Sequence, residues 1–550
     1  MFTIKKTSLF ETPKKAGKNN AFINAGLKKS SQTLSGNGAI KYSTTGNDFV
    51  DQFGKLGSYK ERRNFKDISS DTQLLWSQNP KLTLCFIFFI RLITRVATLF
   101  DGVKTQSVQR GSGLRHEGIM RMIWLHINYP NTFWKNIKIY IAIASWKDIF
   151  QMLQYDLEYN GWDNRILNWQ HFGNLILSGL ENPNTVNLVK KYLPQIQAKR
   201  KCVTIQSQAN TIIAKWIASL LNLNYKQYRK LKTSGNAHVW QQLISKKLFN
   251  NIDFNCVHGR ALMLMVSGKF ITNNGLEDKY DKWISTQPVA KFTGYVHELM
   301  SKVKYNIKPH LKQTINKQFY GLVEIGKKNV NAESTLIVVR DTSGSMGTEA
   351  RGTKQSCYDI AKSLALYFSE FLTGHFANSW IEFNDKANMH QWKGNTPVDK
   401  WLNDHSGFIG STNFQSVIDL FCNLRRQGIN ESDFPTGILC ISDGEFNPTN
   451  LHQTNVDSAR QKLTMNGFSK SYVDKFKIIL WNLQSDYYGD NTGKKFETHG
   501  NVDNVYYFSG YDGSILAFLT GNNQTKSEPK NSDELLNEAL NQEIMQYIEI

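Results

Sequence analysis

The stretch Asp341-Thr342-Ser343-Gly344-Ser345 directly follows an apolar run, Leu336 to Val339, that has the character of a buried strand. A strand that ends in Asp-x-Ser-x-Ser brings one carboxylate and two hydroxyls to a single tight turn. Carboxylate and hydroxyl oxygens are hard donors of the kind that Mg²⁺ binds. Polar turns of this composition also connect strands to helices without any metal, so the pentapeptide alone leaves both interpretations open.

Two downstream segments place further oxygen atoms at similar positions. Gly410-Ser411-Thr412-Asn413 lies at the start of a predicted helix and offers the Thr412 hydroxyl. A predicted strand over 437–442 is followed by Asp443 and Gly444. The carboxyl ends of parallel strands lie at one edge of a sheet, which is where such sheets bind ligands. The sequence therefore predicts an octahedral Mg²⁺ or Mn²⁺ site, completed by water, at Asp341, Ser343, Ser345, Thr412 and Asp443.

The chain after about residue 334 alternates strands with helices, which predicts an α/β doubly wound, mainly parallel sheet. We expect strands over 334–340, 379–384, 387–392, 437–442, 476–483 and 503–508, with 387–392 at an edge. We expect helices over 356–373, 413–426, 451–467 and 513–520.

The chain before that point reads as consecutive amphipathic helices, with no extended β-alternation between them. The expected helices run over 82–100, 116–127, 131–142, 146–157, 165–179, 203–222, 236–248, 258–269, 288–302 and 307–322. Many short helices in series favour an all-α solenoid of HEAT-like pairs. The predicted domains are a basic, partly extended arm (1–70), the HEAT-like domain (71–330), the α/β domain (331–525) and an acidic C-terminal helix (526–550).

The net charge of +20 is unevenly distributed. Residues 331–550 hold 18 Lys and Arg against 27 Asp and Glu, whereas residues 1–330 hold 48 against 19. A strongly basic half predicts a polyanionic partner, most simply nucleic acid. The alternative is that lysine only keeps a large helical surface soluble.

Cysteine usage and hydropathy bear on the compartment. The six cysteines form no C-x-x-C pair, which argues against a zinc site or a disulfide framework and favours a reducing, cytoplasmic location. The residues from Met1 to Phe10 lack the apolar core of a signal peptide. The apolar run 82–90 is too short to span a membrane. We expect a monomer with no membrane partner.

The three motifs, in this order, resemble the von Willebrand factor A domain and its metal-ion-dependent adhesion site, over about residues 334–525. The resemblance implies that Ser343, Ser345 and Thr412 contact the metal directly, whereas the two aspartates act largely through water. It also implies an open coordination position for an acidic residue of a protein partner. Arg340 departs from the pattern, because the residue before the motif is usually apolar; we expect its cation to weaken metal binding or to turn toward solvent.

A basic helical array followed by such a domain resembles the TROVE module family, to which the Ro autoantigen belongs, and a related group of uncharacterised plant, bacterial and phage proteins. The resemblance rests on residues 110–115, 145–149, 252–261, 408–417 and 442–446. It implies a ribonucleoprotein in which helical repeats form a ring around a basic hole. Single-stranded RNA ends would pass through the hole, structured small RNA would bind outside, and the A domain would close the ring.

Basic residues of the helical half are the candidate RNA contacts under that resemblance. Lys199-Arg200-Lys201 and the segment 225–232, where Tyr225 and Tyr228 lie among basic residues, have the composition of a phosphate-binding and base-stacking surface. The candidates are Arg110, Arg115, Lys199, Arg200, Lys201, Lys226, Arg229, Lys230 and Lys232.

Three functions are compatible with these features. The first is a non-catalytic scaffold for single-stranded or misfolded small RNA, with Mg²⁺ or Mn²⁺ in the A domain. The second is a metal-dependent protein-interaction adaptor without an RNA role, for example beside an AAA+ ATPase or in a phage assembly. The third is a nuclease that uses the metal. No catalytic residue set is indicated by spacing, so we expect no enzyme activity.

Overall fold

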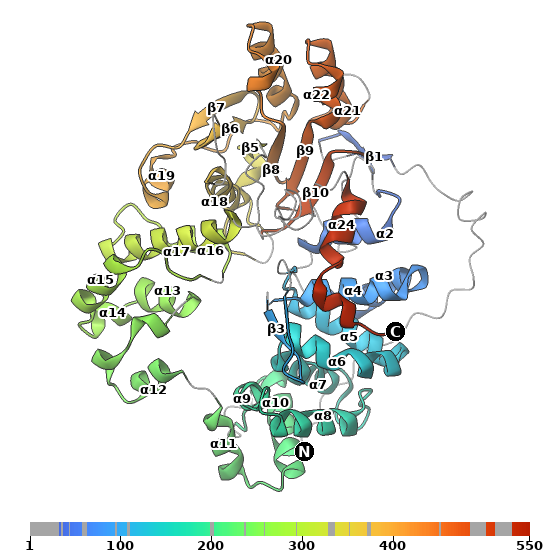
Figure 1. Ribbon diagram of the computed structural model, residues 1–550, viewed down its shortest axis with the longest axis vertical. Helices are drawn as coiled ribbons and strands as arrows, with labels where there is room; N and C mark the ends of the chain where they lie inside the picture. The colour runs from blue at the N-terminus through green and yellow to red at the C-terminus, as the bar shows by residue number, and fades with distance from the viewer. Residues whose placement is uncertain are drawn as a thin grey trace. The chain divides into compact units, whose positions relative to one another are not determined.

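A computed structural model describes residues 32–34, 37–42, 44–57, 63–93, 96–106, 111–197, 203–235, 238–257, 259–292, 294–327, 336–350, 353–370, 376–449, 453–484, 502–511 and 531–550. The chain forms two units by its internal contacts (Figure 1). Unit 1 comprises residues 1–24, 62–246 and 539–550, and unit 2 comprises residues 25–61 and 247–538. Both units are therefore built from separated stretches of chain, and the helical region predicted over 71–330 is divided between them.

Unit 1 contains, as regular elements among its described residues, helices and one short hairpin. Its elements are α3 (Phe65–Gln78), α4 (Pro80–Arg91), β3 (Val96–Thr98), β4 (Lys104–Gln106), α5 (Arg115–Asn128), α6 (Pro130–Ile143), α7 (Trp146–Asn160), α8 (Trp169–Glu181), α9 (Val186–Tyr192), α10 (Ile205–Leu220), α11 (Tyr225–Ser234), α12 (Val239–Ser245) and the 3₁₀ turn η9 (Glu543–Tyr547). The β3–β4 hairpin corrects two predictions: the helix expected over 82–100 ends at Arg91, and the helical series is interrupted by strands.

A buried charge cluster joins three helices of unit 1. Asp148 of α7 is inaccessible to solvent and accepts hydrogen bonds from Arg91 of α4 and Arg115 of α5. Nearby, Glu117 bonds both Arg63 and Arg121, the latter at 3.0 Å. Burial of a carboxylate is costly unless it is paired and hydrogen-bonded, and these arginines supply both conditions.

The final residues of the chain pack on α4 and α6 of unit 1. The Asn136 amide donates to the carbonyl of Glu549 at 2.5 Å and accepts from the Glu549 backbone N–H at 2.9 Å. Lys135 donates to the carbonyl of Ile550 at 2.7 Å, and Lys81 donates to that of Ile548. Asn136 is fully buried, so this two-way amide pair satisfies a side chain that water cannot reach.

Unit 2 opens with a segment from the predicted N-terminal arm. The strands β1 (Gln32–Leu34) and β2 (Ile40–Tyr42) pair as a hairpin, and α2 (Asp48–Lys55) contacts the edge strand of the main sheet. Gly57 makes the close approach possible, because a Cβ there would overlap the carbonyl of Ser509. Part of the predicted arm is thus folded onto the sheet domain.

Helices follow in unit 2 before the sheet begins. They are η3 (Phe249–Asn251), η4 (Phe254–Cys256), α13 (Gly259–Ser267), α14 (Phe270–Asn273), α15 (Glu277–Thr286), α16 (Val296–Met300) and α17 (Pro309–Lys327). The helix expected over 288–302 begins only at Val296, and residues 288–292, 294 and 295 are not helical. Ala290 donates to the carbonyl of Lys317, and the carbonyl of Lys291 accepts from the backbone N–H of Gly259.

The core of unit 2 is a six-stranded mixed sheet in the order β10-β9-β8-β5-β6-β7. All neighbouring strands are parallel except β7, which runs antiparallel at the edge, as predicted. The strands are β5 (Leu336–Asp341), β6 (Ser379–Phe383), β7 (Ala387–Gln391), β8 (Gly437–Ser442), β9 (Lys477–Asn482) and β10 (Val505–Ser509). The sequence order reverses at β5, which lies between β6 and β8, and this switch point places a ligand site at its carboxyl end.

The helices of this part of unit 2 are η5 (Gly344–Gly347), α18 (Cys357–Ser369), α19 (Pro397–Asn403), α20 (Gln415–Arg426), η7 (Glu431–Asp433), α21 (Asn455–Met465), α22 (Lys470–Lys475) and α24 (Ser532–Leu540). Both faces of the sheet carry helices. Side chains such as Val339, Phe383 and Cys440 form one apolar core with α20, α21 and α22. On the opposite face α18 packs against β5, β6 and β8, with Phe368 against Trp481 at 5.7 Å between ring centres. The α/β architecture predicted for this region is confirmed; the helix expected over 513–520 lies outside the described residues.

Candidate metal site and basic surface

The three oxygen-bearing loops converge at the carboxyl ends of β5 and β8. The backbone N–H of Gly344 donates to the carbonyl of Gly410 at 3.1 Å, and that of Ile409 donates to Thr342 at 2.8 Å. The carbonyl of Thr412 accepts from the N–H of Asn447 at 2.9 Å, which joins the second loop to the third. The structure therefore brings the loops of all five predicted metal-site residues together.

Hydrogen bonds fix the two hydroxyls and the first carboxylate in place. Asp341 accepts from the backbone N–H of Ser343 at 2.8 Å and from the hydroxyl of Ser442 at 2.5 Å. The hydroxyls of Ser343 and Ser345 lie 3.2 Å apart. Thr412 is buried, at 2% exposure, on the loop whose Gly410 carbonyl accepts from the N–H of Gly344. The oxygen atoms are thus held by the protein itself, which is the preorganisation that a binding site requires.

Asp341 and Asp443 form a pair of buried carboxylates. Asp341 is 0% exposed and Asp443 is 5% exposed, and neither forms an ion pair with a Lys, Arg or His among the residues that the structure describes. Burial, followed by the charge of Asp443, raises the pKa of Asp341, while the bonds from Ser442 and Ser343 oppose that rise. Burial also raises the pKa of Asp443, against the hydrogen bond from Ser345. Among the described residues, neither charge therefore has a cationic partner.

These residues fit a hard divalent cation. A cation between two buried carboxylates would offset both the desolvation and the mutual repulsion, and the hydroxyls supply the neutral oxygen ligands that Mg²⁺ accepts. The described residues contain no group of three or more His, Cys, Asp and Glu suited to a metal. A zinc-like site is therefore not indicated there, whereas a site with two carboxylates and three hydroxyls is compatible with that observation.

Arg340 does not behave as expected. Its side chain is 0% exposed, so the expectation that it turns toward solvent is wrong. Successive residues of a strand point to opposite faces of the sheet, and the side chain of Arg340 lies on the face that α18 covers. There it bonds Asp404 at 2.6 Å, donates to Ser406, and stacks 3.9 Å above the Trp380 ring. Because the Asp404 carboxylate pairs with the Arg340 guanidinium, we expect this cation to have little effect on metal binding at Asp341.

Several residues that shape the site were not predicted. Ser442 ends β8 and bonds Asp341, and Asp385 fixes the loop before Thr412 by accepting from the N–H of Ser411 at 3.0 Å and from its hydroxyl at 2.6 Å. Asn447 donates to the Ser411 hydroxyl at 2.9 Å. The available signal was their position, because each lies just at or beyond the end of a predicted strand.

The nine predicted RNA-contact residues fall into three groups. Four of them, Arg110, Lys199, Arg200 and Lys201, lie outside the described residues. Two others are engaged in the fold: Arg115 pairs with buried Asp148, and Lys232 donates to the carbonyl of Leu193, where burial lowers its pKa. Their bonds give both a structural role.

The remaining three predicted residues, Lys226, Arg229 and Lys230, are exposed on α11. Residues three and four positions apart share a face of a helix, so these side chains point the same way. Tyr225 is half exposed beside them, with the Lys215 ammonium 5.8 Å above its ring. Tyr228, expected in the same surface, is fully buried and donates to the carbonyl of Pro194 at 2.9 Å, so its predicted stacking role is wrong.

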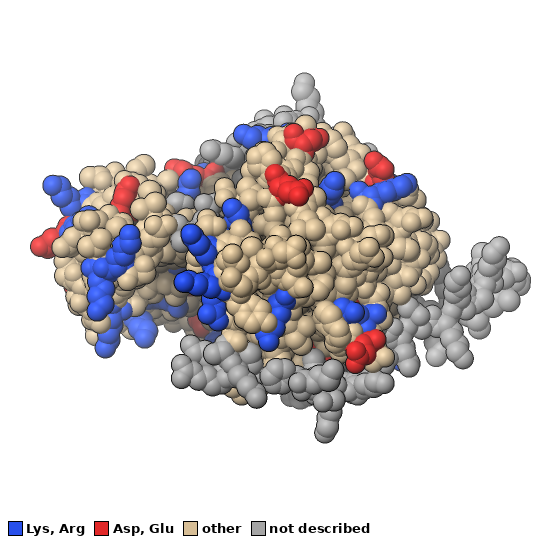
Figure 2. Space-filling view, turned by 90° about the horizontal axis from the view of Figure 1, so that it is seen from below, with Lys and Arg blue, Asp and Glu red and all other residues tan. Residues whose placement is uncertain are grey.

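The side chains of α11 thus form a surface of one charge. The helix contains four basic residues and no acidic residue. On the face of the molecule seen in Figure 2, Lys and Arg side chains are more frequent than Asp and Glu. We call Tyr225, Lys226, Arg229 and Lys230 the α11 surface.

Comparison with known proteins assigns no function to the chain. Residues 335–547 match a family model described as a domain of unknown function (DUF7788). That description names no activity, ligand or partner. Among curated proteins, none matches.

Two solved structures are similar at low levels. One is the Ro (RSR) protein of Deinococcus radiodurans, at 10% identity and a TM-score of 0.31, over 90% of this chain and 94% of that one. The other is an aerotolerance-related membrane protein of Bacteroides fragilis NCTC 9343, at 16% identity and a TM-score of 0.20, over 33% of this chain and 92% of that one. At such scores neither likeness carries an argument about function.

The helices were also compared with the requirements of a membrane span. Among the described residues, none of the helices combines the length and the apolar character needed to cross a bilayer.

Proposed function

We propose that this chain is a non-catalytic RNA-binding scaffold, in which the α11 surface contacts RNA phosphates and the strand-edge site of unit 2 holds Mg²⁺ or Mn²⁺. The observation that supports it most directly is the α11 surface, where three exposed cations share one helix face beside an exposed tyrosine. Phosphate contacts dominate nucleic-acid affinity, and an exposed aromatic ring can stack on an unpaired base.

The excess of basic residues in the first 330 residues also supports RNA as the partner. The basic residues outnumber the acidic ones by 29 over residues 1–330, which favours long-range attraction of a polyanion. The Ro-like ring, the HEAT-like repeat and the passage of RNA ends through a hole stay predictions, as do the cytoplasmic location and the monomeric state.

The two buried carboxylates without a cationic partner among the described residues support the metal-binding part of the proposal. Asp341 and Asp443, with Ser343, Ser345 and Thr412, would hold the cation, which would supply positive charge at an otherwise anionic sheet edge. Within the protein, Ser442 and Asp385 would keep the ligand loops in register.

RNA binding is tested by a gel shift with single-stranded RNA over a salt series. Replacing Lys226, Arg229 and Lys230 by Gln should weaken binding and reduce the slope of log affinity against log salt by about 2, the loss of three contacts at roughly 0.7 each. The matched control replaces the exposed lysines Lys66, Lys104 and Lys147, which removes the same charge elsewhere in unit 1.

Two results would contradict the proposal. Wild-type protein that binds no RNA at low salt would overturn the RNA-binding function. Equal losses in the two triple variants would overturn the role of the α11 surface and leave only general charge attraction.

A further inference from the structure

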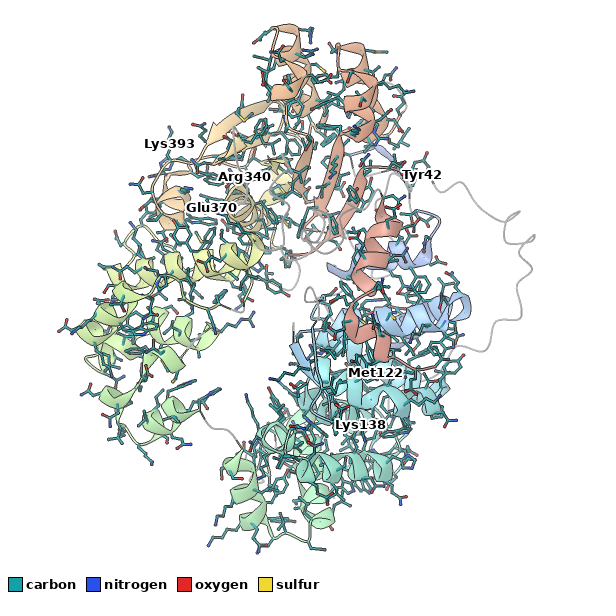
Figure 3. The ribbon with its side chains drawn as sticks, in the orientation of Figure 1. Tyr42, Met122, Lys138, Arg340, Glu370 and Lys393 are labelled. Carbon is teal, nitrogen blue, oxygen red and sulfur yellow. The ribbon has the colours of Figure 1, made fainter. Side chains whose placement is uncertain are left out.

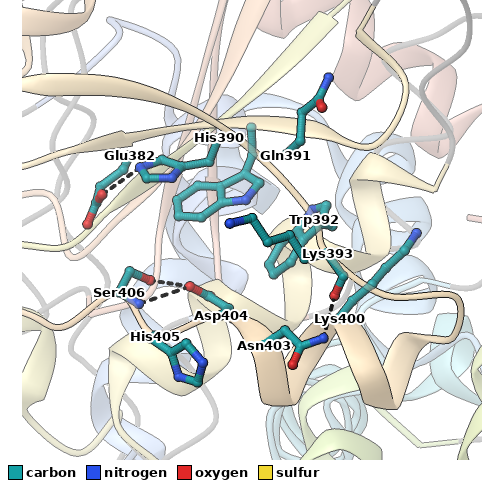
Figure 4. Close-up of a pocket in the computed structure, with 11 residues that line it drawn as sticks. Glu382, His390, Gln391, Trp392, Lys393, Lys400, Asn403, Asp404, His405 and Ser406 are labelled. Atoms are coloured by element: carbon teal, nitrogen blue, oxygen red, sulfur yellow. Dashed lines mark hydrogen bonds and ion pairs between the residues drawn. The ribbon is translucent and has the colours of Figure 1, made fainter.

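A pocket lies at the β7 edge of the sheet, on the face of Arg340, and none of its lining residues is a predicted metal ligand. It is bounded by the end of β6, by β7 and the residues after it, by α19 and by the loop 404–406 (Figure 4). We call it the edge pocket. Its volume of about 250 Å³ is roughly eight times the ~30 Å³ share of one water molecule, so it has room for a small organic molecule.

The inner wall of the edge pocket is a stacked column of three side chains. The guanidinium of Arg340 lies 3.9 Å from the Trp380 ring centre, and the His390 ring stacks on Trp380 at 4.6 Å and 18°. His390 is further fixed by Glu382 at 2.7 Å. Figure 3 shows Arg340 inside the sheet domain and Lys393 at its outer edge. These contacts hold the Trp380 and His390 rings in place without a ligand.

Both carboxylates that line the edge pocket are already engaged. Glu382 bonds His390, and Asp404 bonds Arg340 at 2.6 Å, Ser406, and Lys362 at 3.6 Å. These cations hold the pKa of Asp404 at about 2 against the opposing effect of burial. Asp404 therefore stays charged but has little capacity left to attract a cationic ligand.

The donors of the edge pocket are in surplus. In Figure 4 the Lys393 side chain extends into the pocket, and no hydrogen bond or ion pair holds its ammonium or the His405 ring among the described residues. Trp392 also lines the pocket, and its indole N–H is buried without a partner among the described residues. The Asn403 amide, fixed by its bond to the carbonyl of Lys393 at 3.0 Å, adds another polar group. Engaged acceptors and free donors favour a ligand rich in hydrogen-bond acceptors.

We propose that the edge pocket binds a small phosphate monoester, with Lys393 and His405 contacting the phosphate and the organic group lying along the His390 side. A tetrahedral dianion can accept bonds from donors that approach from several directions, which suits these two flexible arms better than a planar carboxylate does. The pocket is larger than a phosphate ion requires, which favours an ester. This site is independent of the α11 surface and of the metal site.

The test is calorimetric titration of the full chain with inorganic phosphate, ribose 5-phosphate and a nucleoside 5′-monophosphate, with the unphosphorylated nucleoside as a fourth probe. Binding of a phosphate monoester, tighter than that of inorganic phosphate and absent for the nucleoside, is the expected result. The two esters then distinguish a sugar phosphate from a nucleotide as the occupant. If neither ester binds at millimolar concentration, or if the nucleoside binds as well as its monophosphate, the proposal is wrong.

Two variants assign the binding to the edge pocket. Lys393→Gln and His405→Gln should each weaken ester binding about tenfold, the loss of one charge-assisted hydrogen bond. Lys386→Gln is the matched control, because Lys386 is exposed in the turn of the same hairpin and does not line the pocket. Both pocket side chains reach solvent, so thermal melting should confirm unchanged folding. Ester binding that survives both substitutions would overturn the proposal.

Discussion

Asp148 in unit 1 and the Asp341–Asp443 pair in unit 2 are all buried carboxylates, but they differ in the charge of their neighbours. Asp148 lies between two arginines that the chain itself supplies from α4 and α5. The two strand-end aspartates face each other and three hydroxyls, without a cation from the described residues. A buried charge that is paired internally stabilises architecture, whereas one that is left unpaired has free energy to gain from a ligand.

The contrast recurs between consecutive residues of β5. Arg340 and Asp341 are both fully buried, but the first has its counter-ion in Asp404, whereas no described residue supplies one for the second. The strand β5 therefore places a paired cation, Arg340, on one face of the sheet and a carboxylate without a described counter-ion, Asp341, at its own carboxyl end.

The largest expected effect is at Asp148. Asp148→Asn keeps the shape of the side chain but leaves the buried Arg91 without its charge partner, which should cost about 3–5 kcal/mol of unfolding free energy. Urea denaturation measures the loss. Asp163→Asn, an exposed neighbour on the loop after α7, is the control and should change stability by under about 0.5 kcal/mol. A loss as small as the control's would show that the cluster is not structural.

A smaller effect is expected at Arg340. Arg340→Met removes one of two cations near Asp404, and Lys362 remains at 3.6 Å, so the loss should be about 2–3 kcal/mol. Adding Asp404→Asn removes the stranded carboxylate and should recover at least about 1 kcal/mol. Additive losses in this double-mutant cycle would contradict the ion pair.

The smallest effect without metal, and the one that separates the two classes of carboxylate, is expected at Asp443. Asp443→Asn removes a like-charge repulsion, so in EDTA the melting temperature should be unchanged or slightly raised. In the wild type, Mg²⁺ at about 100 times its Kd should add about 2.7 kcal/mol, and the variant should lose that gain. Melting scans in EDTA and in MgCl₂ measure both quantities. A variant that is as unstable in EDTA as Asp148→Asn would place Asp443 among the structural charges.

The sequence predicted the sheet region well, and the three loops of the predicted metal site lie close together in the structure. Strand-to-helix alternation and the polar residues after buried strands are local signals, and both survive in the structure because parallel sheets place those residues at one edge. The ion pair of Arg340 with Asp404 was not predictable in the same way, because the two residues lie 64 positions apart and only the fold brings them together.

The failures in the helical region have physical causes. The segment 288–295 has helical apolar spacing, but its backbone pairs with Lys317 and Gly259, and Gly321 lets α17 approach the carbonyl of Ala290. Tertiary hydrogen bonds override local propensity there. By contrast, the β3–β4 hairpin had a signal in the sequence: the Asp101-Gly102 pair, where Gly102 takes a φ of +90°. The buried state of Tyr228 had none.

The seating of residues 539–550 on unit 1 imposes an order on synthesis. Residues 62–246 leave the ribosome early, but the segment that closes over Asn136 follows only after the whole of unit 2 has been made. At 5–20 residues per second, the intervening chain takes roughly 15–60 s to appear. During that interval the amide of Asn136 lacks its partner at Glu549 and is hydrated instead. Residues 62–246 of unit 1 are therefore made before residues 247–538 of unit 2, and residues 539–550 after them.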